Sequence, residues 1–190
     1  MKQAKVLTEV ELKRVLAVIG HNRHADRNRL LVMISHYAGL RVGEIAALKV
    51  NQVIADDGTA RDHIYVNPDQ AKRGIGRTVF VNKRLKREIA KYLASLPALP
   101  APHRPLIRSQ RGSHFSANSL CQRFMGIYSL AGIDGASSHS GRRFFITKLA
   151  HSGVSAKVIM DLAGHKHLST TQRYIEVNDD LKRAAVELIA

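Results

Sequence analysis

Apolar residues recur with a helical period along most of this chain. In residues 9–19 they occupy one helical face, formed by Leu12, Val15, Leu16 and Ile19. Thr8 and Glu11 have the spacing of a capping box, in which each side chain bonds the backbone N–H of the other residue. The pattern predicts a first helix that begins directly after Thr8.

The same criteria predict further helices. Asn82, Ser116 and Ser155 are residue types that favour helix N-termini, and Gly39 and Gly164 are expected to end helices. The predicted ranges are 26–38, 41–48, 82–96, 116–130, 139–152, 155–163, 170–177 and 179–189.

Two short segments follow a different period. Residues 63–67 and 78–81 alternate polar and apolar positions, and a basic loop joins them. They predict an antiparallel pair of strands, so we expect a mainly α-helical, α+β fold with a small antiparallel β-sheet. Four prolines within residues 97–105 predict an extended linker, the best internal boundary in the chain.

Charge narrows the class of partner. Lys and Arg total 30 against 15 for Asp and Glu, a net charge of +15 that favours nucleic acid or an anionic membrane surface. Apolar runs such as residues 30–34 are far shorter than the roughly 20 residues of a membrane span, so we expect no membrane partner. Cys121 is the only cysteine, which excludes an internal disulfide framework and suits a reducing compartment.

Two arginines stand at predicted helix starts. Arg41 follows a glycine helix end, where free backbone N–H groups favour an anion, and Glu44 lies one turn later. Arg142 shares a helix face with His139, whereas Arg143 is expected to point elsewhere. Taken separately, these residues are also compatible with a surface ion pair and an unrelated histidine.

A lysine, a histidine and a tyrosine complete the set of candidates. Lys72 lies in the hairpin loop, where it is either a solvated charge or a phosphate ligand and proton donor. His165 precedes Tyr174 by nine residues. A metal pair of His165 and His167 is disfavoured, because no third ligand has a supporting spacing.

Together these residue types suit phosphoryl transfer. Arginines bind a phosphate, histidines hydrogen-bond it or move protons, a lysine protonates the leaving oxygen, and a tyrosine is the nucleophile. Because arginines supply the positive charge, we expect neither a metal nor another cofactor. The candidate catalytic residues are Arg41, Lys72, His139, Arg142, His165 and Tyr174.

The order and local context of these residues resemble the tyrosine recombinases of the phage integrase family. The resemblance covers about residues 5–190 and rests on residues 38–45 (AGLRVGEI), on Lys72 followed by Arg77, and on residues 162–174 (LAGHKHLSTTQRY). Gly141 stands where the family usually has a bulky residue, and Phe144 where threonine is common.

The resemblance implies the family's catalytic-domain fold, as a single domain over residues 1–190 without the N-terminal core-binding domain. It implies site-specific cleavage and rejoining of DNA through a 3′-phosphotyrosyl intermediate. In this reading Tyr174 is the nucleophile, Arg41 and Arg142 stabilise the phosphorane, and Lys72 is the general acid. His139 accepts the tyrosine proton, and His165 donates a hydrogen bond to the phosphate.

The resemblance also implies partners. They are double-stranded DNA and further copies of the chain, assembled as a tetramer on DNA through the C-terminal helix at residues 179–189. A cytoplasmic, nucleoid-associated protein of a prokaryote or phage is expected. Two alternatives stay open: a type IB topoisomerase-like enzyme and a catalytically silent DNA-binding accessory protein on the same scaffold.

Overall fold

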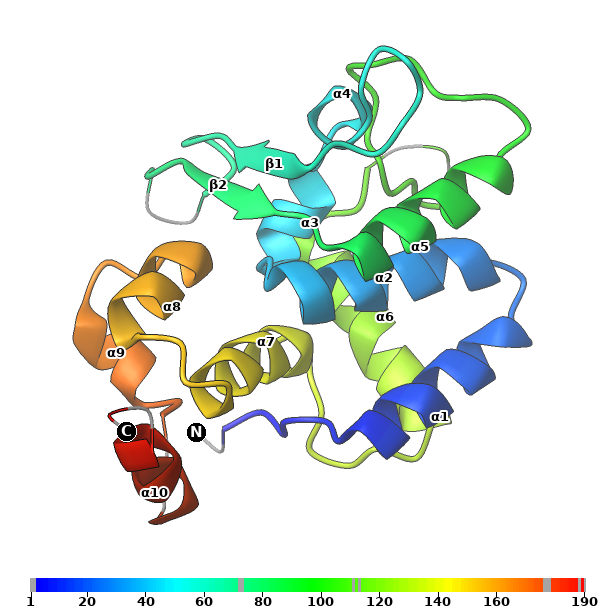
Figure 1. Cartoon of the computed structure of the whole chain (residues 1–190). Helices are drawn as coiled ribbons and strands as arrows, with labels where there is room; N and C mark the ends of the chain where they lie inside the picture. Colours follow the sequence, from blue (N-terminus) through cyan, green and yellow to red (C-terminus); the bar gives the residue numbers. More distant parts are fainter. Residues whose placement is uncertain are drawn as a thin grey trace.

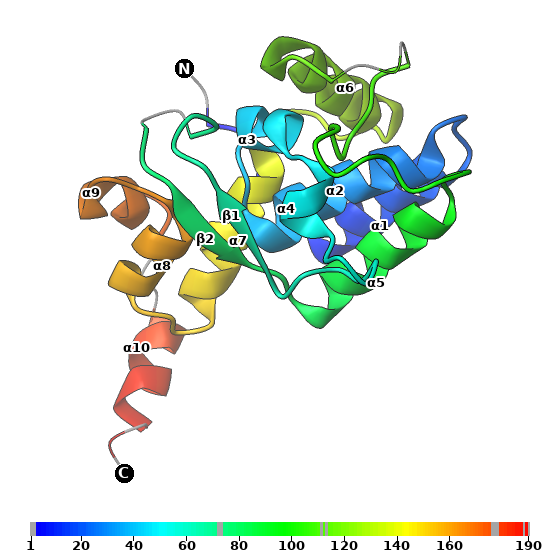
Figure 2. The same ribbon diagram turned by 90° about the horizontal axis from the view of Figure 1, so that it is seen from above.

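The computed structural model describes residues 3–71, 74–110, 112, 114–175, 179–187 and 189. Helices predominate, and one hairpin lies across them (Figures 1 and 2). In chain order the elements are α1 (Glu9–Gly20), α2 (Ala25–Ala38), α3 (Val42–Ala47), α4 (Val50–Val53), β1 (His63–Val66), β2 (Arg77–Phe80), α5 (Lys83–Ala94), α6 (Ala117–Leu130), α7 (Ser140–His151), α8 (Ala156–Ala163), α9 (Leu168–Gln172) and α10 (Asp179–Glu187).

The four predicted helix N-caps, Thr8, Asn82, Ser116 and Ser155, are confirmed at atomic level. Thr8 Oγ1 accepts from the N–H of Glu11 at 3.2 Å, and Glu11 accepts in return from the N–H of Thr8 at 2.9 Å. Asn82, Ser116 and Ser155 cap α5, α6 and α8 with their side-chain oxygens. The predicted mainly helical fold with a small antiparallel sheet is therefore confirmed.

Two helices differ clearly from the prediction. The four-residue helix α4 was not predicted, because it is too short to show a period. Helix α9 covers Leu168–Gln172 instead of residues 170–177, so Tyr174 lies just after the helix and not within it. Residues 176–178 of the predicted helix lie outside the described residues.

The hairpin has one buried face. β1 and β2 pair antiparallel, with Ile64 opposite Val79 and Val66 opposite Arg77. Ile64, Val66 and Val79 are buried, and Tyr65 and Phe80 on the other face are half exposed or more. Because β2 begins at Arg77, one residue earlier than predicted, this arginine is fixed by the strand at the sheet end nearest α8.

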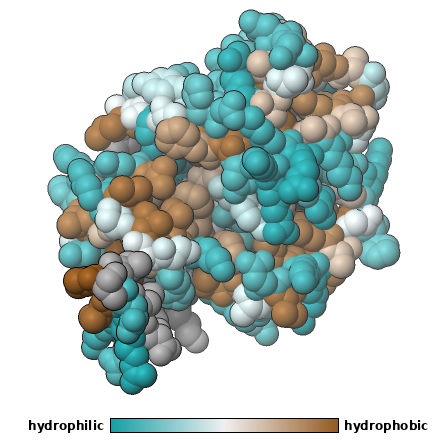
Figure 3. All heavy atoms as spheres, in the orientation of Figure 1, coloured by the Kyte–Doolittle hydropathy of each residue, from teal (hydrophilic) through white to brown (hydrophobic). Residues whose placement is uncertain are grey.

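Buried apolar side chains form two groups of very different size. The large cluster extends in sequence from Leu7 to Ile133 and contains residues of α1–α6 and both strands. The small cluster consists of Ile146, Ala150, Ile159 and Ala163, with Tyr174 among the side chains packed against it. In Figure 3 hydrophobic residues gather at the surface over α8, whereas hydrophilic residues cover α5.

The proline-rich segment at residues 97–105 does not separate two cores. The N–H of Val50 donates to the carbonyl of Arg104, and the N–H of Leu106 donates to the carbonyl of Leu48. Leu106 and Ile107 then enter the large cluster, which also contains Leu120 of α6. Backbone hydrogen bonds therefore join the segment to the chain between α3 and α4. Helices on both sides of the segment share one core.

Helices α2 and α7 pack closely, and Gly141 permits this contact. A Cβ atom at Gly141 would lie 2.2 Å from Ser35 Oγ and 2.8 Å from His36 Nδ1. Phe144 lies one turn later, and the centroid of its ring is 5.2 Å from the ring centroid of His36. The small residue before Arg142 thus sets the distance between the two helices, and a bulky one would force them apart.

Within the described ranges, no helix is long and apolar enough to cross a membrane.

Candidate active site

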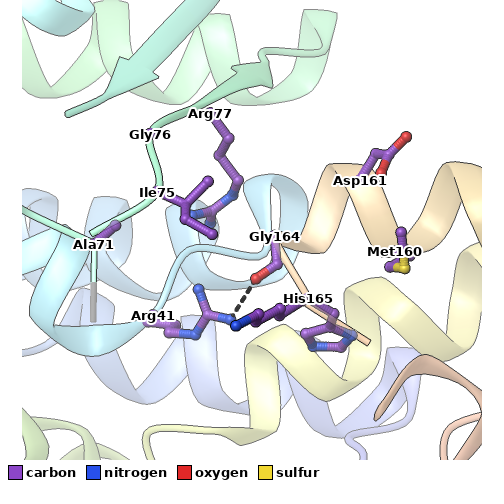
Figure 4. A pocket seen from close by; sticks show the side chains of 10 residues that line it. Arg41, Ala71, Ile75, Gly76, Arg77, Met160, Asp161, Gly164 and His165 are labelled. Atoms are coloured by element: carbon purple, nitrogen blue, oxygen red, sulfur yellow. Dashed lines mark hydrogen bonds between the residues drawn. The ribbon is translucent and has the colours of Figure 1, made fainter. Parts of the chain in front are cut away.

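Arg41 is held on two sides at the start of α3. Its Nη1 donates to Glu44 Oε1 at 2.9 Å, and its Nη2 donates to the carbonyl of Gly164 at 2.9 Å (Figure 4). Glu44 also accepts from the backbone N–H of Arg41 at 2.7 Å, which caps the helix. The predicted pairing of Arg41 with Glu44 is therefore present, and the Gly164 contact ties α3 to the end of α8.

Arg77 meets the same carboxylate from β2. Its Nη1 and Nη2 donate to Glu44 Oε1 and Oε2 at 2.7 and 2.8 Å, the bidentate geometry that makes such pairs strong. A Cβ on Gly164 would lie 2.6 Å from Arg77 Cδ, so only glycine allows the side chain past this point. One buried carboxylate thus fixes two arginines from different elements.

Arg142 lies deeper, with only 5% of its surface exposed. Its Nη1 donates to the carbonyl of Gly39 at 2.7 Å, and its Nη2 donates to the carbonyl of Ala163 at 2.5 Å. Gly39 and Gly164 both adopt positive φ at the ends of α2 and α8, which turns the last helix carbonyls toward the arginines. We call Arg41, Glu44, Arg77 and Arg142 the arginine cluster.

Burial and neighbouring charges perturb this cluster. Burial lowers the pKa of Arg142 to about 9, and the cations of Arg41 and Arg77 act in the same direction, while Glu44 and Tyr174 oppose it. Burial alone would raise the pKa of Glu44, but the bonds and charges of Arg77 and Arg41 outweigh it and hold that pKa below its ordinary value. At neutral pH Arg142 therefore stays a cation and Glu44 an anion.

His165 and Tyr174 lie together in residues 165–175, which we call the tyrosine segment. The two rings stack with centroids 5.9 Å apart and an interplanar angle of 22°. His165 Nδ1 lies 2.9 Å from Thr171 Oγ1, which orients the imidazole. Tyr174 is half-buried against the small cluster, and its phenol is near enough to influence Arg142.

A pocket of about 260 Å³ lies between these parts. Figure 4 shows Arg41, Arg77, Gly164 and His165 around it, with Ala71 of the hairpin loop at its edge. Lys72, the predicted general acid, follows Ala71 but lies outside the described residues. His139 is the N-cap residue of α7, one turn before Arg142, and its side chain is exposed.

Three features of the site were missed in the sequence. Arg77 appeared only as part of a motif, and its bidentate pairing with Glu44 was not predicted. The backbone carbonyls that hold the arginines carry no sequence signal apart from the helix-ending glycines. Arg143 was expected to point elsewhere, and it does diverge from Arg142, but its guanidinium lies 5.3 Å from the ring centroid of Tyr174.

The residues that could ligate a metal are dispersed. Among the described residues, no three or more His, Cys, Asp or Glu side chains gather closely enough to hold a metal ion. His165 Nδ1 lies 2.9 Å from Thr171 Oγ1, and His167 is the exposed N-cap residue of α9.

Comparison with known proteins identifies the family. The model of the phage integrase family matches residues 5–180. The tyrosine recombinase XerA of Thermococcus kodakarensis is 34% identical over 183 residues, which cover 96% of this chain and 62% of that protein. Transposase A of transposon Tn554 from Staphylococcus aureus is 27% identical over 191 residues, which cover 95% of this chain and 51% of that protein. The chain thus spans between half and two thirds of the length of these relatives.

Solved structures show the same fold. A crystal structure of XerA recombinase superimposes with a TM-score of 0.76 at 24% identity, covering 99% of this chain and 64% of the other. The Tn1549 transposon integrase, solved with a circular intermediate DNA, superimposes with a TM-score of 0.78 at 17% identity. The match covers 98% of this chain and 66% of the other. With the family model matching nearly all of its length, the chain belongs to the phage integrase family of tyrosine recombinases.

Proposed function

We propose that residues 1–190 act as the catalytic domain of a site-specific DNA recombinase, which cleaves and rejoins double-stranded DNA through a 3′-phosphotyrosyl intermediate. The observation that carries this proposal is the imbalance of charge in the arginine cluster. Three guanidinium groups surround Glu44, the only carboxylate among the described residues that forms an ion pair with any of them. The excess positive charge lies beside a pocket, and it suits a phosphodiester.

The arginines are also prepared for this substrate before it binds. Arg41 and Arg142 each donate two of their hydrogen bonds within the protein, and a guanidinium has five N–H groups in all. The remaining N–H groups can therefore bind phosphate oxygens without reorganisation of the side chains. Preorganised donors of this kind are the main source of stabilisation in phosphoryl transfer.

In the proposed reaction, the phenol oxygen of Tyr174 attacks the scissile phosphorus while the bond to the 5′ oxygen breaks. His139 accepts the tyrosine proton, and Lys72 protonates the departing 5′ oxygen, so atoms and charge balance. Arg41 and Arg142 stabilise the pentacovalent phosphorane, and His165 donates a hydrogen bond to it. Attack by a 5′ hydroxyl on the phosphotyrosyl bond then rejoins the strand, and no nucleotide cofactor is consumed.

Double-stranded DNA is the proposed partner. The net charge of +15 favours a polyanion. Each phosphate that a Lys or Arg neutralises steepens the slope of log binding constant against log salt concentration by about 0.9. The similar Tn1549 integrase was solved with DNA, which supports the same substrate class here. A protein of this kind acts on DNA in the cytoplasm of a prokaryote or in a phage-infected cell.

A nicked DNA duplex tests the proposal directly. The duplex is built from sequences that the protein selects out of a random pool, with the nick placed so that cleavage releases a short strand and cannot be reversed. We expect a covalent protein–DNA adduct on a denaturing gel, formed equally well in excess EDTA. Selection of DNA without any adduct would instead support the silent accessory protein, and a strict requirement for a divalent metal would support a nuclease.

We further propose that α10 joins neighbouring copies in a tetramer on DNA. Figures 1 and 2 both show α10 at the edge of the molecule, and Val186 is 65% exposed on this helix. A helix of this length is marginal alone and needs a partner surface. A chain truncated after Asn178 should bind one half-site normally but form fewer higher-order DNA complexes. Equal assembly by the truncated chain would contradict the proposal.

A further inference from the structure

Arg143 makes a contact that the proposed chemistry has not used. It follows Arg142 in α7, and its guanidinium carbon lies 5.3 Å from the ring centroid of Tyr174. This is within the roughly 6 Å range in which a cation is attracted to an aromatic ring. Consecutive arginines on one helix thus serve different groups: Arg142 bonds the carbonyls of Gly39 and Ala163, and Arg143 contacts the candidate nucleophile.

The other contacts of Arg143 leave its charge available for this interaction. Its Nη1 donates to the amide oxygen of Gln3, a neutral group in the segment before α1. Within the described part of the chain, its buried Nε has no hydrogen-bond partner, and no carboxylate forms an ion pair with it. A half-buried cation without a neutralising anion gains more from an aromatic ring than a fully solvated one.

The ring of Tyr174 is otherwise held weakly. His165 stacks on it, and the small cluster supports it, but the helix α9 ends before Tyr174 at Gln172. The orientation of the phenol therefore depends on contacts to the ring itself. A contact from α7, the helix that also carries Arg142, couples the position of the tyrosine to that of the arginine cluster.

We propose that Arg143 is a positioning residue for Tyr174. Its guanidinium attracts the aromatic ring and holds the phenol in the orientation from which it attacks the phosphate that Arg142 binds, and Gln3 in turn orients Arg143. This role rests on the proposed function. It makes the charge of Arg143 a requirement for rapid cleavage, acting through the aromatic ring of Tyr174.

Three variants separate the charge from the shape of the side chain. Arg143→Met keeps most of the aliphatic volume and removes the cation, and Arg143→Lys keeps a cation that also binds aromatic faces. Arg87→Met is the matched control, since it removes the same charge from an exposed position on α5. Each variant is assayed for half-site affinity and for the single-turnover rate of adduct formation on the nicked duplex at saturating protein.

We expect Arg143→Met to lower the saturated rate about 3- to 30-fold, which corresponds to the range of one cation–π contact. Half-site affinity should stay within about 2-fold of wild type, a range that corresponds to less than 0.5 kcal/mol. Arg143→Lys should recover most of the rate, and Arg87→Met should lose none. A wild-type rate in Arg143→Met would overturn the proposal. So would a loss of affinity with an unchanged saturated rate, which would assign Arg143 to a DNA phosphate, or equal impairment of the Lys and Met variants.

A double-mutant cycle tests the contact without DNA. Unfolding equilibria are compared for wild type, Arg143→Met, Tyr174→Leu and the double variant, and we expect a coupling of about 2- to 5-fold in the unfolding constant. If the cycle shows coupling but the wild type forms no adduct, the contact is real and the proposed recombinase activity is rejected. Adduct formation by wild type with no coupling would reject the positioning role alone.

Discussion

Arg41, Glu44 and Arg77 lie on elements of the large hydrophobic cluster, whereas the tyrosine segment packs against the small one. Arg142 is on α7, which contributes Ile146 and Ala150 to the small cluster, and it bonds the carbonyls of Gly39 and Ala163, so it joins the two parts. Arg41 and Glu44 lie between Leu40 and Ile45, both buried in the large cluster. Tyr174 packs against a core of four buried residues. The same contrast appears in the polar contacts, because ion pairs and short bonds to carbonyls fix the arginines, while a hydroxyl, a ring stack and a cation hold the segment.

This difference corresponds to different demands on the two parts. Charge stabilisation works best when the donors are fixed before the substrate arrives. In the proposed reaction, Tyr174 attacks, stays attached to DNA and is later released, which needs a segment that can adjust. Contacts worth about 1 kcal/mol each permit such adjustment, whereas breaking a buried ion pair costs about 3–5 kcal/mol. We therefore infer that the arginine cluster is rigid and that the tyrosine segment moves.

The largest expected effect is the loss of the proposed nucleophile. Tyr174→Phe should abolish adduct formation on the nicked duplex and leave half-site affinity within about 2-fold, because the phenol oxygen contributes little net binding free energy. Tyr128→Phe is the matched control. Tyr128 is 1% exposed and, in the described part of the chain, its hydroxyl has no hydrogen-bond partner, so removing that oxygen should change neither measurement. Adducts that persist in Tyr174→Phe would show that another residue attacks.

Removing either arginine should cost about 100-fold in the single-turnover rate, the effect of losing one preorganised donor to developing charge. The variants are Arg41→Ala and Arg142→Ala, measured at saturating protein. Arg29→Ala is the control, because Arg29 also pairs with a glutamate, Glu88, but does so between α2 and α5. A rate within a few-fold of wild type in Arg41→Ala or Arg142→Ala would remove that arginine from the site.

The sequence predicts the arginine cluster better than the tyrosine segment. Arg41, Glu44 and Arg142 are found from helix starts and from i, i+3 spacing, which are local relations. Their carbonyl partners are not found, because Arg41 and Gly164 are 123 positions apart and Arg142 and Gly39 are 103 apart. Only the folded chain brings a helix end to an arginine at that separation.

The same limit explains the errors in the tyrosine segment. Residues 170–177 are predicted as a short helix that contains Tyr174, but α9 ends at Gln172. The spacing correctly predicts that the side chains of Arg143 and Arg142 point in different directions. It contains no information about which residue Arg143 contacts. The pairing of Arg77 with Glu44 depends on a strand boundary that propensity does not define within one residue.

Removing the central carboxylate tests the rigidity of the arginine cluster. Glu44 is 1% exposed, so Glu44→Gln should lower the free energy of unfolding by about 3–5 kcal/mol, since it leaves buried cations without a counter-charge. Glu88→Gln, which breaks a more exposed ion pair, should cost about 1 kcal/mol or less. Chemical denaturation at pH 7 measures both. Equal losses in the two variants would mean that Glu44 does not hold the cluster together.

The pH dependence of the same variants gives an independent check. The pKa of Glu44 is lowered in the folded chain, so its contribution to stability is complete above the ordinary value of 4.5 and is lost as the pH falls through the folded value. Glu44→Gln has no such contribution to lose. The stability difference between wild type and Glu44→Gln should therefore narrow in acid, and a difference that stays constant would contradict the assignment of the ion pairs.

The smallest expected effect distinguishes the two cores. Ile159→Val and Ile34→Val each delete one buried methylene, at positions that are both fully buried, and each should cost about 0.5–1.5 kcal/mol in the free energy of unfolding. Only Ile159 lies in the cluster that supports Tyr174, so Ile159→Val should also slow adduct formation, by about 2- to 5-fold if up to 1 kcal/mol of that loss reaches the tyrosine. Ile34→Val lies in the large cluster and should react at the wild-type rate at saturating protein. Equal rates in the two variants, at matched losses of stability, would show that the small core does not control the tyrosine and that the two parts of the site share one rigid frame.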